Sequence, residues 1–502
     1  MKPNIIFILA DDHSYFGIGK ESPSVISPNL NMLADEGAYF KNCFCASPVC
    51  SPARASILTG MLPSAHGVHD WIISGNVDYD NLPDNLKNRP ALKNNEKTAV
   101  DFLDGFTTYA DILVQNGYEA ALSGKWHLGD TVKKRKTYSY WNVLLRGGCS
   151  YKDYDLYNTG TFERHTEYVT DKITDNAVAY LKNRNKDKPF YLGIHYTAPH
   201  TPWDKKEHKD EIWQLYENND FSELKFDTPI HPDSILHEYI GDTEEKRQTY
   251  IRGYFSAITG MDDNIGKIIK TLTELDLLEN TLIVFTGDNG MNLGHHGVWG
   301  KGNGTYPQNF YEESVKVPLI FYHKGKIAPS VCTDLISHTD IFQTLLEYSG
   351  IDTNLNCASD LSGSEQSYPF DNKRPGKSFC PVFEGKSFSR TSVPIVSEYG
   401  AVRMLRTERY KLIQNYIDNR SLFFDLKRDP QEKNNCIQNA EYSSIINKMA
   451  AEIDSVFETY SLNEHDGRYQ FPKGMGQIAK VRKTDGTGSF KQNIRMYWDK
   501  QK

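Results

Sequence analysis

The chain of 502 residues has no hydrophobic run long enough to span a bilayer, and its N-terminus has no signal peptide. A membrane-spanning helix needs about 20 consecutive apolar residues. The first apolar run, 4–10, is much shorter than that and follows directly on Met1-Lys2-Pro3. The sequence therefore predicts no membrane-embedded part. Either the chain stays in the cytoplasm or a leader was removed before this numbering begins.

Positive charge is also in short supply. The chain has 57 Lys and Arg against 65 Asp and Glu, which gives a formal net charge of −8. Proteins that hold nucleic acid or an anionic membrane by general electrostatic attraction carry a basic surface. The composition argues against both of these partners, and an anionic substrate must be attracted by a local cluster of cations.

The eight cysteines include no CxxC pair, and no matching pair of histidines accompanies them. Zinc sites usually have such spacing, so a metal site at Cys43, Cys45 and Cys50 is only a weak alternative. If Cys50 takes part in chemistry, an odd number of cysteines remains. The cysteines are therefore not predicted to form a disulfide framework.

The sequence does contain a regular alternation of apolar strands and helical segments. With 39% hydrophobic and 24% charged residues, the chain can bury a large core. Strands are predicted at 4–10, 118–122, 190–196 and 281–286, and helices at 28–37, from 50 onward, 106–117, 170–183 and 246–276. This order predicts an α/β fold with a large doubly wound mixed sheet flanked by helices.

The composition changes near residue 375. Residues 354–378 are rich in Ser, Asp, Asn, Gly and Pro and are predicted to form a connector. Beyond it we expect strands at 393–398, 402–406 and 410–414, a turn at 423–430 and a helix near 441–459. The predicted domains are therefore 1–375 and a smaller α+β domain, 376–502. The basic, Gly-containing tail from Asp466 either folds back on the main domain or extends into solvent.

Polar motifs follow four of the predicted strands. They are Asp11-Asp12, the segment Gly124-Lys125-Trp126-His127-Leu128-Gly129, the segment Ala198-Pro199-His200, and Asp288-Asn289. Open α/β sheets bind ligands at the carboxyl ends of their strands, so we expect these motifs to share one crevice. The oxygen-bearing side chains of Asp11, Asp12, Asp288 and Asn289 suit Ca²⁺ or Mg²⁺. Turn and N-cap residues are the plainer interpretation of an isolated Asp pair.

Cys50 is predicted to begin a helix, because Pro52 suits the first helical turn. The N-terminus of a helix favours an anion, and Arg54, one turn further on, lies on the same face. Lys125 and His127 alternate in a predicted extended segment and should point the same way. A small buried thiol and ordinary surface cations are the plainer interpretations of these residues.

The run Cys50-Ser51-Pro52-Ala53-Arg54, continued by Ala55 to Gly60, resembles the signature of the sulfatase family. The resemblance implies an alkaline phosphatase-like fold. It also implies that Cys50 is oxidised after translation to formylglycine, an aldehyde whose hydrate attacks sulfur. Such a modification requires a formylglycine-generating maturase as a transient partner.

The resemblance also implies roles for single residues. It places Ca²⁺ on Asp11, Asp12, Cys50, Asp288 and Asn289, and it makes the catalytic set Cys50, Arg54, Lys125, His127, His200, Lys301 and Asp288. Lys301, in Trp299-Gly300-Lys301-Gly302, matches the second active-site lysine of the family. With a divalent cation bound, three carboxylates and three cationic side chains leave this pocket with a net positive charge, which suits a small anion.

In the mechanism that the resemblance implies, Asp288 helps to deprotonate a hydroxyl of the hydrate, and Lys125 and Lys301 stabilise the sulfuryl oxygens. His200 protonates the departing alcohol, and His127 accepts the proton of the second hydroxyl as sulfate leaves. The hydrolysis of a sulfate ester is therefore the expected reaction.

Recognition of the leaving group depends on residues outside this shared set. The candidates are His69, Asp70, Trp71 and Arg403, with His66, Trp203 and His296 as further ones. The similarity of these motifs to those of bacterial polysaccharide sulfatases implies a sulfated saccharide substrate, such as a glycosaminoglycan-derived sugar. It also implies a periplasmic or secreted location. Two alternatives remain open: a phosphate-ester or phosphonate hydrolase of the same superfamily, and a non-catalytic sulfated-glycan-binding protein. Nothing in the sequence indicates the oligomeric state.

Overall fold

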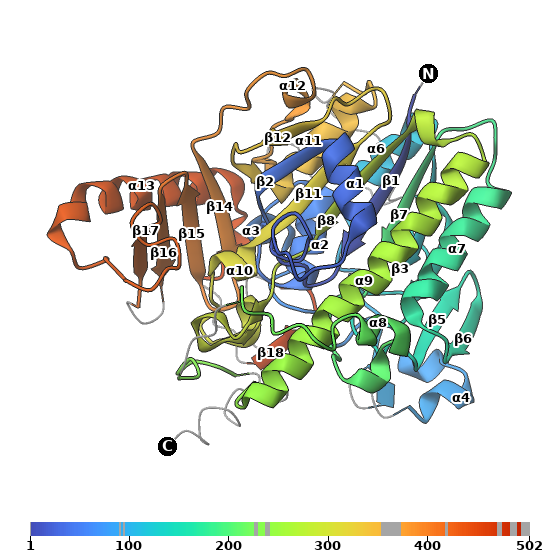
Figure 1. The fold of residues 1–502 in the computed structure, drawn as a ribbon, viewed down its shortest axis with the longest axis horizontal. Coiled ribbons are helices and arrows are strands. Elements are labelled where there is room, and N and C mark those ends of the chain that lie inside the picture. The colour runs from blue at the N-terminus through green and yellow to red at the C-terminus, as the bar shows by residue number, and fades with distance from the viewer. Residues whose placement is uncertain are drawn as a thin grey trace.

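The computed structural model describes residues 2–89, 92–93, 96–224, 229–235, 241–352, 373–416, 420–468, 474–481 and 489–492. Its centre is one large mixed sheet covered by helices on both faces (Figure 1). The central strands are β1 (Asn4–Ala10), β3 (Glu119–Gly124), β7 (Phe190–His195) and β8 (Thr281–Gly287). The predicted α/β fold class is confirmed.

The sheet has the strand order β12-β2-β11-β8-β1-β7-β3-β4-β5-β6. Strand β1 pairs in parallel with both β7 and β8, and β3 pairs in parallel with β7. The carboxyl ends of these four strands therefore lie at the same edge of the sheet, which is the edge where the polar motifs of the sequence begin.

The two faces of β1 bury different side chains. Ile5, Phe7 and Leu9 pack into one hydrophobic core, and Ile6 and Ile8 pack into the other. Side chains of a strand alternate between faces, so an unbroken apolar strand is what a sheet covered on both sides requires. One core includes α2 (Cys50–Thr59), α6 (Tyr109–Gln115) and α11 (His338–Tyr348). The other includes α1 (Pro28–Glu36), α7 (Val169–Asn183) and α9 (Glu244–Glu274).

Several strands at the two sides of the sheet carry weaker sequence signals and were not predicted. They are β2 (Ala38–Phe44), β4 (Tyr138–Leu144), β5 (Tyr154–Asn158), β6 (Thr161–His165), β11 (Lys316–Tyr322), β12 (Ser330–Cys332) and β13 (Ile336–Ser337). Strand β11 runs antiparallel to both β8 and β2, which makes the sheet mixed. Short helices and a small ribbon complete the region: α3 (Pro63–His66), α4 (Asp84–Lys87), α8 (Asp210–Gln214), α10 (Glu312–Val315), β9 (Asn292–Leu293) and β10 (Trp299–Gly300).

A smaller four-stranded antiparallel sheet projects from one side of the main body, with one long helix across it (Figure 1). It follows α12 (Cys380–Phe383) and contains β14 (Ser392–Ser397), β15 (Val402–Thr407), β16 (Tyr410–Asn415), β17 (Leu422–Asp425) and α13 (Ser443–Tyr460). The turn predicted over 423–426 is wrong, because Phe423 and Phe424 are buried and pair with β16 as the last strand. The α+β character of this part is confirmed.

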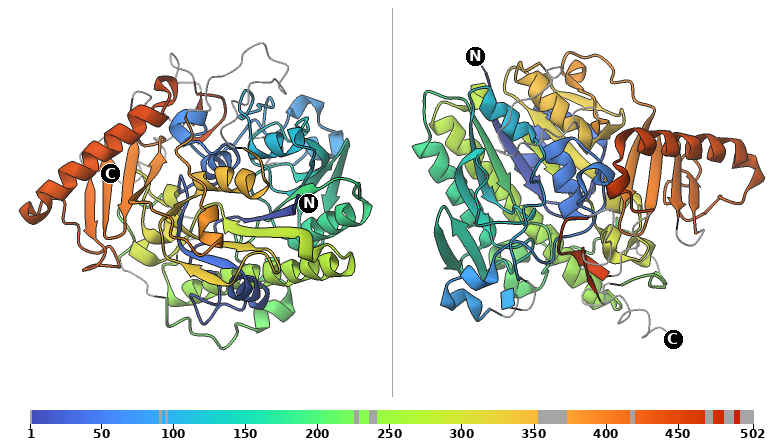
Figure 2. Two further views of the ribbon diagram at one scale, coloured as in Figure 1. Left: turned by 90° about the horizontal axis from the view of Figure 1, so that it is seen from above. Right: turned by 180° about the vertical axis from the view of Figure 1, so that it is seen from behind.

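The tail beyond Asp466 returns to the main body. Strand β18 (Gly474–Gln477) pairs with β19 (Phe490–Gln492) and lies beneath the main body, apart from the projecting sheet (Figure 2). The described part of the tail therefore folds back on the main domain, which was one of the two possibilities that the sequence left open. Most of the predicted connector, from residue 353 to 372, lies outside the described residues, and the domain boundary at 375 stays a prediction.

Among the described helices, none has the length and apolar character needed to cross a membrane. The seven cysteines within the described ranges are all free thiols.

Candidate active site

Two strand ends meet at an acidic centre. Strands β1 and β8 are in register from Asn4 to Ala10, so Asp11 and Asp12 emerge beside Asp288 and Asn289. The Asp12 amide donates to Asp288 Oδ1 at 3.0 Å, and Asn289 Nδ2 donates to Asp12 Oδ1 at 2.8 Å. Oxygen atoms of the three carboxylates all lie within 4.8 Å of one another. The predicted convergence of these four side chains is therefore present.

The oxygen atoms of this centre fit a hard divalent cation. Asp11 Oδ1 and Asn289 Oδ1 are buried, and neither has a hydrogen-bond partner among the described residues. Buried polar atoms are normally satisfied, and a missing ligand is a common reason for an exception. Carboxylate and amide oxygens are the ligands that Ca²⁺ prefers, and Mg²⁺ accepts them as well.

Cys50 lies at the beginning of helix α2, every residue of which is buried. Only 3% of Cys50 is exposed, and burial is the main reason why the pKa of its thiol is raised. Its sulfur lies 3.5 Å from His127 Nδ1. The thiol is therefore enclosed beside a single imidazole.

Arg54, one turn along α2, joins the helix to the acidic centre. Its Nε donates to Asp288 Oδ2 at 2.8 Å, and its Nη1 donates to the Lys125 carbonyl at 3.1 Å. Its Nη2 is 3.8 Å from Asp11 Oδ1. Arg54 is itself buried, so these contacts fix the position of Cys50 relative to the carboxylates.

Two lysines complete the charge balance. Lys125 Nζ is 2.5 Å from Asp11 Oδ2, and Lys301 Nζ is 2.5 Å from Asp12 Oδ1. Burial opposes the ionisation of Asp11, but Lys125 and the other nearby cations outweigh it, so the pKa of Asp11 is lowered. Burial likewise opposes the charge on Lys301, but Asp12 and the other nearby acidic groups together outweigh it and raise the pKa of Lys301. Three carboxylates thus face three cationic side chains, and a divalent cation would make the pocket positive.

His127 is neutral, and its contacts determine which nitrogen carries the hydrogen. Burial, with Lys125 nearby, lowers the pKa of His127 well below its usual value. Its Nε2 is 2.9 Å from the Ile72 carbonyl oxygen, which can only accept a hydrogen bond. The hydrogen therefore sits on Nε2, and the lone pair of Nδ1 faces Cys50. A proton at residue 50 would have an acceptor in place.

The segment that carries Lys125 and His127 is not simply extended, as the sequence had suggested. Strand β3 ends at Gly124, and His127 has a left-handed backbone with φ of 55°. The bend sends Lys125 to Asp11 and the His127 ring to Cys50. A Cβ atom at Gly147 would come within 2.1 Å of the His127 ring, so this loop packs against the imidazole. Gly147 and Ile72 are contacts that the sequence analysis missed.

His200 lies at the more open side of the centre, with 24% of its side chain exposed. Its Nδ1 donates to the Thr201 carbonyl at 2.8 Å, and its Nε2 is 3.7 Å from Asp12 Oδ2. An imidazole in this position can exchange a proton with a group that enters from solvent.

The candidate substrate residues fall into two groups. Asp70 is buried near Lys301, whose charge acts on the Asp70 carboxyl, and His69 and Trp71 flank it in the chain. Arg403 is different: it is fully buried and paired with Glu398 and Asp466, so it is not available to a substrate, and that expectation is wrong. The remaining candidates are packed: Trp203 in an aromatic core, His66 against Ser56, and His296 against Tyr311.

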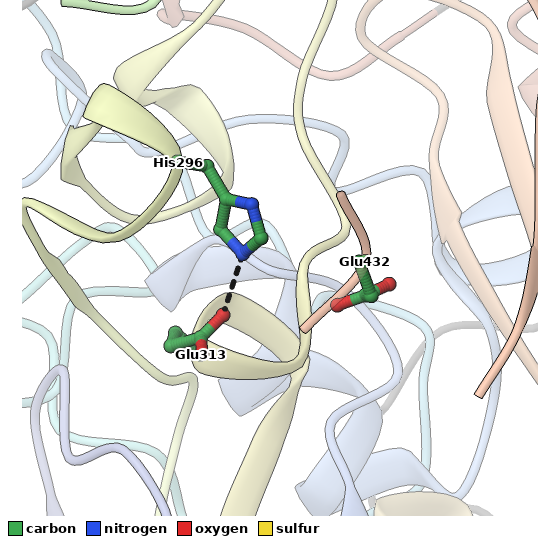
Figure 3. Close-up of side chains that lie close together, drawn as sticks. All are labelled: His296, Glu313 and Glu432. Atoms are coloured by element: carbon green, nitrogen blue, oxygen red, sulfur yellow. Dashed lines mark hydrogen bonds and ion pairs between the residues drawn. The ribbon is translucent and has the colours of Figure 1, made fainter. Parts of the chain in front are cut away.

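A second cluster of metal-ligand types lies outside the centre. It consists of His296, Glu313 and Glu432, and His296 Nε2 is 3.2 Å from Glu313 Oε2 (Figure 3). Lys411 Nζ is 2.5 Å from Glu432 Oε1, and the Glu312 amide donates to Glu432 Oε2 at 2.7 Å. An ammonium already supplies the positive charge here, so we treat this cluster as a structural ion-pair network.

Comparison with solved structures defines the class of protein. One match is a structure solved in complex with its substrate D-glucosamine-2-N,6-O-disulfate; the TM-score is 0.73 at 24% identity, covering 93% of this chain and 99% of that one. Another is the phosphonate monoester hydrolase of Agrobacterium radiobacter, with a TM-score of 0.64 at 18% identity, covering 92% and 97%. At these identities the matches show the fold, which is alkaline phosphatase-like.

Comparison of sequences then gives the family. Residues 3–351 match the model of the Sulfatase family, and residues 294–459 match the one described as N-sulphoglucosamine sulphohydrolase, C-terminal. The chain belongs to the sulfatase family and is a sulfuric ester hydrolase. It is 26% identical to N-acetylglucosamine-6-O-sulfatase of Bacteroides thetaiotaomicron, over 93% of this chain and 88% of that protein. It is 29% identical to choline-sulfatase of Rhizobium meliloti, over 87% and 83%.

Proposed function

We propose that this sulfatase removes sulfate from a glycosaminoglycan-derived or other sulfated sugar and uses a formylglycine made from Cys50 beside a bound Ca²⁺. The observation that carries the proposal is the position of Cys50. Its side chain lies at the N-terminus of a buried helix and faces the lone pair of a neutral His127, and the same helix is linked through Arg54 to the carboxylates of Asp288 and Asp11. No other cysteine in the described part of the chain has such surroundings.

The residues of the centre have different proposed roles, according to their positions. Lys125 and Lys301 are the cations next to the acidic centre that could bind sulfuryl oxygens, since a fixed positive charge stabilises the negative charge that develops in the transition state. His127 Nδ1 accepts a proton from residue 50. His200, on the exposed side, is placed to give a proton to the leaving sugar oxygen.

Two further groups would complete the chemistry. Formylglycine, made by a maturase in the producing cell, would supply hydroxyl groups of a hydrated aldehyde in place of a thiol. Ca²⁺, or Mg²⁺ as the alternative, would be held by Asp11, Asp12, Asp288 and Asn289 and would supply positive charge beside residue 50. Arg54 and Asp288 orient residue 50 whichever cation is bound.

The leaving sugar would be recognised by the segment next to Lys301. His69, Asp70 and Trp71 belong to it, and Trp71 is half-buried. The N-acetylglucosamine-6-O-sulfatase and the disulfated glucosamine complex among the relatives favour an amino sugar. A periplasmic or secreted location and the number of subunits stay predictions.

Two measurements test the proposal. Mass spectrometry of the peptide that contains position 50, from host-expressed protein, should show the mass of formylglycine. The Cys50→Ala variant should lose turnover of sulfated sugars while it keeps its melting temperature, and Cys436→Ala, at a half-buried site in the projecting sheet domain, should remain active. Full activity of Cys50→Ala, or faster hydrolysis of matched phosphate or phosphonate esters, would rule the proposal out in favour of the superfamily alternative.

A further inference from the structure

Strand β18 reaches the catalytic centre although it lies outside the residues that the two family models match, 3–351 and 294–459. Gln477 forms a parallel bridge with Ile72. The Gln477 amide donates to the Trp71 carbonyl at 2.8 Å, and the Ile73 amide donates to the Gln477 carbonyl at 3.0 Å. The C-terminal tail therefore adds a strand to the segment that follows the catalytic helix.

The Gln477 side chain, which is fully buried, holds this segment at several points. Its Oε1 accepts from the His69 amide at 2.8 Å and from the Asp70 amide at 3.4 Å. Its Nε2 donates to the Gly67 carbonyl at 3.0 Å and to the Ala479 carbonyl at 3.1 Å. One amide side chain thus satisfies four backbone groups, three of which belong to the segment 67–70.

Gly476 makes the neighbouring contact. Its amide donates to Asp70 Oδ2 at 2.8 Å. Its φ is +76°, and a Cβ atom there would come within 2.7 Å of the Ile73 side chain. A glycine is therefore required for β18 to approach so closely, while Asp70 Oδ1 stays without a hydrogen-bond partner among the described residues.

The same segment contacts the catalytic residues on its other side. The Ile72 amide donates to Ser51 Oγ at 3.2 Å, next to Cys50. The Ile72 carbonyl accepts the hydrogen of His127 Nε2 at 2.9 Å, which fixes the tautomer that faces residue 50. A shift of the segment would therefore change the orientation of His127 as well as the side of the pocket next to Lys301.

We propose that β18 is a positioning element of the active site, and that Gln477 is a positioning residue for both His127 and the substrate-facing residues His69, Asp70 and Trp71. The inference rests on the proposed function, because it assigns these residues to the recognition of the sugar. Gln477 contacts no reacting atom itself. It acts through the backbone of the segment 67–72.

The test compares Gln477→Met with wild type in the full chain, produced together with a maturase. Methionine has a similar length but no amide, so the four hydrogen bonds are lost. We expect kcat/KM to fall about 10- to 100-fold on whichever of N-acetylglucosamine 6-sulfate, glucosamine-2-N,6-O-disulfate and 4-nitrocatechol sulfate the wild type hydrolyses fastest, since small misplacements of catalytic groups have effects of this size. Gln477→Asn, which keeps the amide, should recover part of the loss.

Two further readouts separate positioning from a general loss of structure. The pH profile of kcat should shift in Gln477→Met because His127 loses its fixed orientation. Inhibition by inorganic sulfate, which probes only the anion pocket, should change less than about twofold. The control is Lys480→Met, in the same tail. The ammonium of Lys480 contacts only Asp104 among the described residues, so this variant should behave as wild type.

Each remaining outcome supports or overturns the inference about Gln477. If Gln477→Met changes only the melting temperature, and activity per folded molecule and the pH profile stay as in wild type, the inference is overturned and the proposed function stands. If Gln477→Met does not fold, Gln477→Asn supplies the same three measurements. If wild type hydrolyses none of the three sulfate esters, both the proposed function and this inference are overturned.

Discussion

The molecule contains two clusters of carboxylates and cations, one fully and one partly buried, and they differ in how closely cations pair with their carboxylates. In the catalytic centre, Asp11 Oδ1 and Asn289 Oδ1 have no hydrogen-bond partner among the described residues. In the second cluster, Glu432 Oε1 also has no hydrogen bond within the described part of the chain, but the Lys411 ammonium lies 2.5 Å from it, whereas the cation beside Asp11 Oδ1 is 3.8 Å away. Glu432 Oε2 accepts from the Glu312 amide, and Glu313 pairs with His296.

The difference separates a binding site from a structural one. A buried carboxylate is costly unless it is paired, so a cluster that pairs its own charges avoids most of that cost and needs no ligand. A cluster that leaves oxygen atoms unsatisfied is suited to a cation from outside. Composition alone would rank both as metal sites, since each contains at least three residues of the ligand types.

The largest expected effect is on activity, from a change in the first cluster. Asp288→Asn removes a carboxylate that pairs with Arg54 and lies beside Asp12. We expect kcat to fall about 1,000-fold, because the electrostatic arrangement around residue 50 is lost. Steady-state kinetics on a sulfated sugar would show it, and Glu313→Gln in the second cluster serves as the matched control with near wild-type kcat. Equal losses in both variants would erase the distinction.

The next effect is on stability, from the second cluster. Lys411→Met leaves the buried Glu432 and Glu312 without their shared ammonium, whose Nζ is 2.5 and 2.8 Å from their carboxylates. Removing one partner of a buried pair costs about 3–5 kcal/mol of unfolding free energy. Denaturant unfolding would measure the loss, and kcat per folded molecule should not change. A large drop in kcat without destabilisation would contradict the assignment.

Asp70 provides an intermediate case, a buried carboxyl that accepts from backbone amides and has no ion pair within 4 Å among the described residues. Burial raises the pKa of Asp70 from 3.8 to about 7. The folded state therefore binds more protons than the unfolded state between these values, and the unfolding free energy falls as pH rises through that window. Asp70→Asn should abolish this slope and gain up to a few kcal/mol at pH 8 relative to wild type, at about 1.36 kcal/mol per pKa unit. Melting temperatures at pH 5 and pH 8 would test the sign.

The smallest effect concerns the cation itself. Ca²⁺ at about 100 times its dissociation constant should stabilise wild type by about 2.7 kcal/mol. Thermal shift with and without a chelator would measure this gain. Asp12→Ala should lose most of the shift and Glu313→Gln should keep it. A shift that depends on Glu313 would move the metal site to the second cluster.

Much of the fold could be predicted because its central strands are unambiguous. The run 5–10 is apolar throughout, and such a short run is typical of a strand covered on both faces. The projecting sheet was harder to predict from the sequence, since Phe423 and Phe424 belong to a strand of only four residues that a turn follows closely. The side strands β4 to β6 have mixed burial and no clear alternation, so neither strand pattern marks them.

The residues of the candidate site, too, could be predicted from the sequence only in part. The cysteine motif and the acidic pairs after strands β1 and β8 could be found in the sequence because each is a local pattern. Arg403 was a wrong expectation, because its burial against Glu398 and Asp466 depends on a tail more than 60 residues further along the chain. The tautomer of His127 also lay beyond prediction, since it depends on the Ile72 carbonyl.

The chemical groups of the site and the strand that each one follows could be found in the sequence, because hydrophobic periodicity and short motifs are local properties of the chain. The fold is needed to show which carboxylates have close cationic partners, which nitrogen of His127 faces residue 50, and that Gln477 of the tail pairs with Ile72. Those contacts join residues well separated in the chain, in the case of His127 and Ile72 by 55 positions, and their energies depend on distances of a few ångströms that no local pattern specifies.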